Sequence, residues 1–264
     1  MFYDNFTSDQ ICGIFTKWHF VAIGVFVVTM IIALYLSRNF TQEKVKKMLV
    51  FNAILVTIME LIKIVIRLIR GTNINGWVPL YFCSLFIFAS LFGICKNKFI
   101  RNMGYCFMVC GGIIASACYT IYPTTSLLLY PIWHPASLHS LFYHWIMFYT
   151  GVMLLVKGIY TPKARDFGYY FAFTTIFTAL AVIINLATGS NLMLISQPFG
   201  IEILQAMYDI SPIFYGLSVY IAQSVLLFWA IYGIYKLALL IIGKRHNTNK
   251  PNLDEDEEPH LTET

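Results

Sequence analysis

Long apolar runs separated by short polar segments repeat along most of the chain. Each run is long enough to cross the hydrocarbon core of a bilayer, which takes about 20 residues at a helical rise of about 1.5 Å per residue. The pattern predicts an all-α, polytopic membrane protein with seven transmembrane helices. These helices are expected near residues 18–37, 48–69, 78–95, 102–121, 137–156, 167–187 and 212–236.

Lysine and arginine follow a regular alternation among the connecting segments. They gather after the first, third, fifth and seventh runs, whereas 122–136 and 188–211 contain none. The positive-inside rule assigns the basic segments to the cytoplasm. We therefore expect an external N-terminal segment (1–17), a seven-helix transmembrane domain (18–240) and a disordered, acidic, cytoplasmic C-terminal tail (241–264).

Composition agrees with this class of protein. Of the 264 residues, 58% are hydrophobic and 12% are charged, whereas about a quarter of the residues in soluble domains are charged. The net charge of +5 is then a consequence of topology and indicates no nucleic-acid partner. Membrane lipids are the expected partners, no particular oligomeric state is indicated, and a bacterial plasma membrane is the favoured location.

The second apolar run contains polar and ionisable residues that a lipid-facing helix would exclude. They are Asn52, Glu60, Lys63 and Arg67. At about 100° per residue they share an arc of about 80°, which predicts that this face points into the helix bundle. Two interpretations fit: Glu60 and Lys63 form a buried structural ion pair, or the face lines a path for a solute or protons.

A cysteine and two histidines are candidates for nucleophilic chemistry. Pro79 is expected in the first turn of the third helix, with Cys83 one turn deeper, and His139 and His144 lie near the outer end of the fifth run. Because both helices enter from outside, Cys83 and His144 are expected at similar depth. A Cys–His pair with an acidic or amide group orienting the imidazole makes a thiol an acyl acceptor.

Each of these residues also has a plainer interpretation. Cysteines in membrane helices are commonly packing residues, and an imidazole near the interface can serve as a hydrogen-bonding group. His139 and His144 are five residues apart and lie on different faces of a helix. The six cysteines also lack paired metal-binding spacing, so no metal site is expected.

Four features resemble the YwaF-like family of integral membrane proteins, whose animal relatives include a transmembrane phospholipid (ether lipid) acyltransferase. They are Glu60 in the second run, P-L-Y-F-C-S at 79–84, His144 in the fifth run, and N-L-A-T-G-S-N-L-M-L-I-S-Q-P at 185–198. Their order and spacing cover roughly residues 40–235. The sequence departs from the family in having Tyr81 where a histidine is often found.

The resemblance implies a thioester mechanism without a soluble cofactor. Cys83 corresponds to the acyl-accepting nucleophile and His144 to its base. Asn185 or Asn191 would orient the imidazole or donate to the oxyanion, and Glu60 would support the site through its charge. The expected supporting or substrate-binding residues are His139, Asn191, Lys63, Tyr81 and Ser84.

Two function classes therefore follow from the sequence. The first is a membrane-embedded Cys/His acyltransferase or lipid ester hydrolase that acts on phospholipid acyl chains. The second is a solute or proton transporter, or a ligand-binding membrane protein, that uses the Glu60, Lys63 and Arg67 face. They differ at Cys83, because an enzyme needs its sulfur and a transport path tolerates serine or alanine there.

Overall fold

The computed structural model describes residues 6–72, 74–123, 125–198 and 202–248, with side chains described as far as residue 241. Every regular element in these ranges is a helix. Six helical segments are long and apolar enough to cross a membrane, which confirms the prediction of a multi-pass helical membrane protein. Their bounds are Lys17–Leu36, Gln42–Ile69, Lys98–Ile121, Pro135–Val156, Ala164–Thr188 and Pro212–Ile241.

These segments correspond to six of the seven predicted spans. The first, second and fifth predicted spans are each a single helix. These helices are α1 (Lys17–Leu36), α2 (Gln42–Ile69) and α7 (Pro135–Val156). The remaining three are each built from consecutive elements. These are α5 (Lys98–Cys106), η1 (Phe107–Gly112) and α6 (Ile113–Ile121); η2 (Ala164–Asp166) and α8 (Phe167–Thr188); α10 (Pro212–Ile221), η4 (Ala222–Leu226) and α11 (Leu227–Thr248).

Side-chain caps begin several of these helices. The hydroxyls of Thr16 and Thr41 accept from backbone N–H groups in the first turns of α1 and α2. Asn97 caps α5 in the same way, and the Nδ1 atom of His134 accepts from the N–H of Ala136 at the start of α7. Each cap satisfies a donor that has no partner within its own helix.

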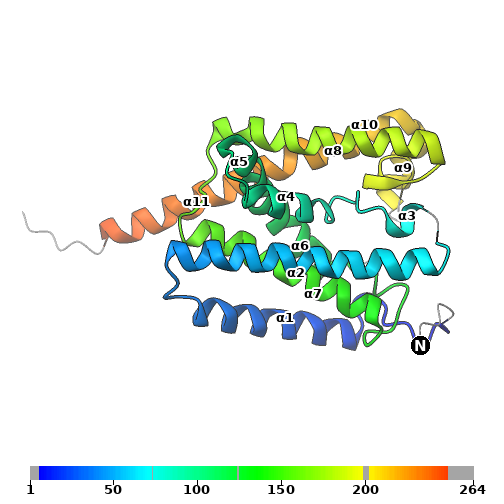
Figure 1. The fold of residues 1–264 in the computed structure, drawn as a ribbon, viewed down its shortest axis with the longest axis horizontal. Helices are drawn as coiled ribbons and strands as arrows, with labels where there is room; N and C mark the ends of the chain where they lie inside the picture. The colour runs from blue at the N-terminus through cyan, green and yellow to red at the C-terminus, as the bar shows by residue number, and fades with distance from the viewer. Residues whose placement is uncertain (1–5, 73, 124, 199–201, 249–264) are drawn as a thin grey trace, which may run out of the picture.

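The third predicted span, 78–95, is not a continuous helix. The chain forms a single helical turn, α3 (Ile74–Trp77), then an irregular stretch, and then the nine-residue helix α4 (Leu85–Gly93). Figure 1 shows this segment returning from the end of the bundle where α2 stops toward α5 at the other end. The expectation that a helix begins at Pro79 is therefore wrong, since α4 begins at Leu85.

Apolar side chains cover the outside of the bundle, and the residues at its centre are closely packed. Large apolar side chains on the outer helices are exposed, for example Ile31 on α1 and Leu186 on α8, the latter at 84%. Such surface is suited to lipid. At the centre every residue of η1 is buried. A Cβ atom on Gly104 would lie 2.3 Å from the carbonyl oxygen of Ala89, so glycine at this position allows α5 and α4 to pack closely.

Helix α1 begins and helix α11 ends at opposite ends of the bundle (Figure 1). Helix α11 continues to Thr248, so the segment predicted to be a disordered tail from residue 241 begins as helix. The acidic part of that predicted tail, after residue 248, lies outside the described residues, as do residues 1–5 of the predicted external segment.

Candidate functional site

The polar face of α2 points into the bundle, as predicted. Asn52 is buried and donates to the hydroxyl of Thr150 on α7 at 2.9 Å. Glu60 is only 3% exposed and forms an ion pair with Lys63, whose side chain is 29% exposed. Burial of a carboxylate is tolerated when a cation compensates its charge, so this pair explains how Glu60 is accommodated in an apolar bundle.

Arg67 lies one helical turn beyond Lys63 on the same face. Its guanidinium donates to the hydroxyl of Tyr130 at 3.2 Å. No described carboxylate forms an ion pair with Arg67. Because Arg67 is in the last turn of α2, its charge also interacts favourably with the negative end of the helix dipole.

Cys83 lies in the turn that leads into α4. Its backbone carbonyl accepts a hydrogen bond from the Tyr143 hydroxyl of α7 at 3.3 Å. Its side chain is partly buried. Ser84, which follows, is in the N-cap position of α4 but makes no side-chain cap. No hydrogen bond in the described part of the chain uses the Ser84 N–H, so the start of α4 keeps a free donor beside the thiol.

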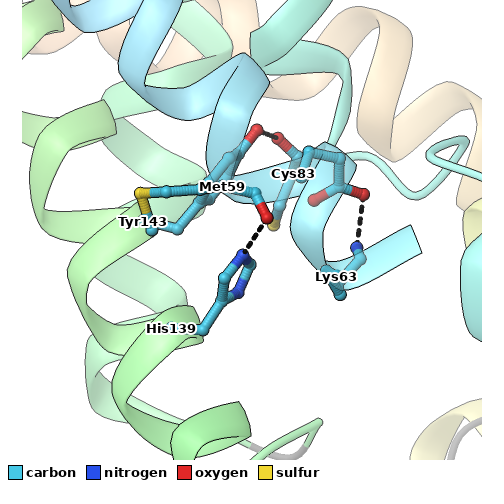
Figure 2. A network of polar contacts seen from close by, with 6 residues as sticks. Met59, Lys63, Cys83, His139 and Tyr143 are labelled. Atoms are coloured by element: carbon cyan, nitrogen blue, oxygen red, sulfur yellow. Dashed lines mark hydrogen bonds and ion pairs between the residues drawn. The ribbon is translucent and has the colours of Figure 1, made fainter. Parts of the chain in front are cut away.

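Three elements meet around this turn. Figure 2 shows Cys83 between α2, which carries Lys63, and α7, which carries His139 and Tyr143. The Nε2 atom of His139 bonds to the backbone carbonyl of Met59 on α2 at 3.2 Å. Because a carbonyl only accepts, this nitrogen carries the proton. His139 therefore ties α7 to α2 beside the Glu60–Lys63 pair.

Tyr81 lies in the same irregular stretch as Cys83. It is partly buried and packs against the central core, and no described hydrogen bond uses its hydroxyl. Its observed contribution is therefore to packing.

His144 is a buried titratable side chain of α7. It is 6% exposed, and its Nδ1 atom bonds to the backbone carbonyl of Ser140 at 2.7 Å. The proton must be on Nδ1, since a carbonyl cannot donate, and Nε2 is then an unprotonated acceptor in the neutral ring. Nε2 is buried and has no hydrogen-bond partner among the described residues.

Two tyrosines contact His144, and one of them also contacts Cys83. Tyr119 stacks on the imidazole of His144, with ring centroids 3.5 Å apart, and Tyr143 contacts it edge-on at 5.7 Å while bonding to Cys83. Cys83 and His144 thus share Tyr143 as a neighbour, but no hydrogen bond joins them in the described structure.

No described hydrogen bond joins Asn185 or Asn191 to His144. The Asn185 amide donates to the Leu192 carbonyl and the Ser196 hydroxyl, both at 3.0 Å, and accepts from the Leu192 N–H at 2.9 Å. The expected role of an asparagine in orienting His144 differs from what is observed, because the Ser140 carbonyl orients that ring. Asn185 instead shapes the loop that follows α8.

Asn191 has a similar place in this loop. Its side-chain oxygen accepts from the N–H groups of Ser196 and Gln197, and its backbone N–H donates to the side-chain oxygen of Asn75 in α3 at 2.8 Å. The loop includes the short helix η3 (Leu192–Leu194). The sequence segment 185–198 therefore packs against the stretch that carries Cys83.

Sequence reasoning missed Tyr119, Tyr143 and Ser140. The chain has 17 tyrosines, and nothing in the local pattern distinguishes the two that contact His144. Ser140 contributes through its backbone carbonyl, which any residue would supply. The only available signal was the i, i+4 spacing of Ser140 and His144 on one helix face.

A metal centre has no candidate ligands in the part of the chain that the structure describes. No three His, Cys, Asp or Glu side chains gather closely enough there to hold a metal ion.

Comparison with known proteins identifies the family of the chain. No curated protein and no solved structure matches the chain. The model of the TMEM164 family matches residues 14–242, which include every helix from α1 through most of α11 and all the candidate site residues. The chain therefore belongs to the TMEM164 family, a family of membrane proteins.

Proposed function

We propose that the protein is a membrane-embedded acyltransferase or lipid ester hydrolase acting on phospholipid acyl chains. Cys83 is the nucleophile and His144 the general base. The observation that carries the proposal is the buried Nε2 of His144, which has no hydrogen-bond partner among the described residues. The Ser140 carbonyl keeps the imidazole proton on Nδ1, so Nε2 is free to accept a proton. A neutral imidazole with a free nitrogen beside a cysteine-bearing turn is suited to accept a thiol proton.

The reaction would proceed in two steps. The Cys83 sulfur attacks the ester carbonyl carbon, an S–C bond forms and the ester C–O bond breaks. His144 takes the thiol proton and gives it to the departing alkoxide. Water or a lipid hydroxyl then attacks the thioester, and its proton returns through His144 to the Cys83 sulfur. Catalytic hydrogen bonds are often absent or long before substrate binds and form in the complex, so this sequence requires the Cys83 thiol to approach Nε2.

Oxyanion stabilisation is assigned to the backbone at the start of α4. The Ser84 N–H has no acceptor among the described residues, and it follows the nucleophile directly. A donor preorganised in a low-dielectric site stabilises the charge that develops on the carbonyl oxygen. The asparagines expected from the sequence for this role are committed to the 185–198 loop. Glu60 and Lys63 support the site through charge.

The likeness to the YwaF-like family and to the animal phospholipid acyltransferase supports the same chemistry. We also propose that the chain crosses a bacterial plasma membrane seven times. The N-terminus would lie outside the cell and the C-terminus in the cytoplasm. The third crossing would be 78–95. Non-helical backbone at membrane depth is tolerated where protein surrounds it, and Leu80 and most residues of α4 are buried.

A transport function for the Glu60, Lys63 and Arg67 face is the competing proposal. One observation favours it: Arg67 has no described carboxylate partner. The Glu60–Lys63 pair opposes it, because a closed ion pair leaves neither group free to receive a solute ion. Replacement of Cys83 by serine separates the two functions, since transport requires no sulfur at that position.

The direct test uses membranes that contain wild-type protein, Cys83→Ala or His144→Ala. A lipid-like thiol-reactive probe reports nucleophile reactivity, and the phospholipid acyl profile of the cells reports turnover. We expect labelling that needs both residues and an acyl shift that is lost in both variants. An unlabelled Cys83 together with an unchanged acyl profile would reject the enzyme and favour transport.

A further inference from the structure

We infer that Gln223 is a positioning residue for the Cys83 turn, acting through the backbones of Met193 and Leu80. The inference rests on the proposed role of Cys83 as a nucleophile. Gln223 lies in η4, far from Cys83 in sequence, and it belongs to no motif identified in the chain. It therefore extends the site to the last long helical segment.

Two hydrogen bonds to backbone carbonyls connect Gln223 to the Cys83 turn. The Nε2 atom of Gln223 donates to the carbonyl of Met193 at 3.0 Å. The N–H of Met193 donates to the carbonyl of Leu80 at 3.1 Å. Leu80 is three residues before Cys83 and is itself buried. Gln223 thus restrains the backbone of Met193, which in turn bonds to the start of the Cys83 turn.

The conformation of Met193 requires such support. Its φ is 58° and its ψ is 6°, in the left-handed region, and its side chain is fully buried. Residues other than glycine rarely adopt this conformation. Strained backbone of this kind persists where its surroundings determine it, and it concentrates at functional sites. The Gln223 and Leu80 contacts use both polar groups of Met193.

The Cys83 turn needs external support because its own helix begins only at Leu85. At one end Met193 holds the Leu80 carbonyl, and at the other end Tyr143 donates to the Cys83 carbonyl. These two bonds reach the turn from different elements, the 185–198 loop and α7. Loss of the first would leave the turn fixed at only one end.

Gln223 lies in the π-helical segment η4 and is itself held by a hydrogen bond from α8. Its backbone carbonyl accepts from the Tyr170 hydroxyl of α8 at 2.9 Å. This contact orients the peptide from which the Gln223 side chain extends. A π-helical turn inside an α-helix is frequently found at functional positions, and here it coincides with the residue that contacts Met193.

Tyr215 supplies a matched control. Its hydroxyl donates to the carbonyls of Leu194 at 2.6 Å and Gln197 at 2.9 Å, in the same loop but not at Met193. General loosening of the loop would make Tyr215→Phe as damaging as Gln223→Ala. A specific connection through Met193 makes the Gln223 variants more damaging to Cys83.

The experiment compares wild type, Gln223→Ala, Gln223→Met and Tyr215→Phe in membranes. N-ethylmaleimide labelling, located by mass spectrometry, gives the alkylation rates of Cys83 and of fully buried Cys106, the internal measure of folding. We expect faster alkylation at Cys83 alone in both Gln223 variants, because this small reagent reports access to the sulfur of a loosened turn and does not depend on lipid binding or on His144 as the lipid-like probe does. Acyl transfer should show kcat lowered about 10- to 100-fold by the misplaced thiol, with KM unchanged, and Tyr215→Phe should behave as wild type.

Two results would overturn the inference. One is a Cys83 alkylation rate equal to that of wild type in both Gln223 variants. The other is a parallel rise at Cys106, which would indicate general unfolding. If the wild type transfers no acyl group while Cys83 alkylation still rises in the Gln223 variants, the proposed function fails and the positioning of the turn by Gln223 stands.

Discussion

The phenol ring of Tyr119 lies flat against the imidazole of His144, with centroids 3.5 Å apart and planes 7° apart. The stack fixes the plane of the imidazole, and the Ser140 carbonyl fixes its rotation and protonation. Tyr119 is itself held by a short hydrogen bond to Ser126. The direction of the free Nε2 is therefore determined by neighbouring α6 and α7 residues before any substrate binds.

Replacing Tyr119 tests the value of the stack. Tyr119→Phe retains the ring, whereas Tyr119→Leu removes it and frees the imidazole to turn. Since aromatic pairs contribute about 0.5–1.5 kcal/mol, we expect the leucine variant to form the Cys83 thioester about 2- to 10-fold more slowly than the phenylalanine variant. Stopped-flow measurement of acylation compares them. Equal rates in the two variants would show that the stack does not align the base.

The Ser84 N–H is tested by a pair of substitutions that differ in one donor. The φ of Ser84 is −67°, which matches the fixed φ of proline. Ser84→Pro removes the N–H and Ser84→Ala keeps it. We expect kcat to fall about 10²- to 10³-fold in the proline variant, as for loss of an oxyanion donor, and to change little in the alanine variant. Similar kcat values in both would exclude this N–H as the donor.

The Glu60–Lys63 pair is expected to act as a unit in stability. Glu60→Leu leaves the Lys63 ammonium without its partner and should lower stability by about 2–4 kcal/mol. Glu60→Leu combined with Lys63→Leu removes both charges and should recover most of that loss. Thermal unfolding in detergent gives the Tm of each variant. A double variant less stable than Glu60→Leu would contradict a simple ion pair.

Gly104 tests the close approach of α5 to α4. A Cβ atom there would lie 2.3 Å from the Ala89 carbonyl oxygen and 2.5 Å from the Gly93 nitrogen. Gly104→Ala should therefore lower stability by about 1–3 kcal/mol. The control is Gly24→Ala in α1, where nothing lies within 4 Å and helix propensity favours alanine. A Tm for Gly104→Ala at or above that of the control would refute the packing.

Much of the fold was predictable because length and periodicity act locally. Runs of about 20 apolar residues indicated the six long helical segments, and the 100° repeat predicted that Asn52 and Glu60 face inward, as observed. Of the two interpretations that the sequence left open for this face, a buried Glu60–Lys63 ion pair is the one observed. These features depend on a single helix and on the cost of exposing charge to lipid.

The details of the site were not predictable because distant residues determine them. Pro79 suits a first helical turn, yet the Leu80 carbonyl bonds to Met193 and the helix begins only at Leu85. The 185–198 segment was expected to supply a group to His144, but its asparagines shape a loop that supports the Cys83 stretch. Tyr119 and Tyr143 acquire their roles only when α6 and α7 pack.

The central claim is that Cys83 carries an acyl group during turnover, with His144 as its base. The test uses purified protein in vesicles of phosphatidylcholine that carries one isotopically labelled acyl chain. The reaction is quenched in acid, and the protein is digested and examined by mass spectrometry. We predict a labelled, hydroxylamine-sensitive acyl group on the Cys83 peptide that forms far more slowly in His144→Ala and is absent in Cys83→Ser. Acyl transfer that continues in Cys83→Ala, or a wild-type Cys83 that never carries label, would contradict the claim.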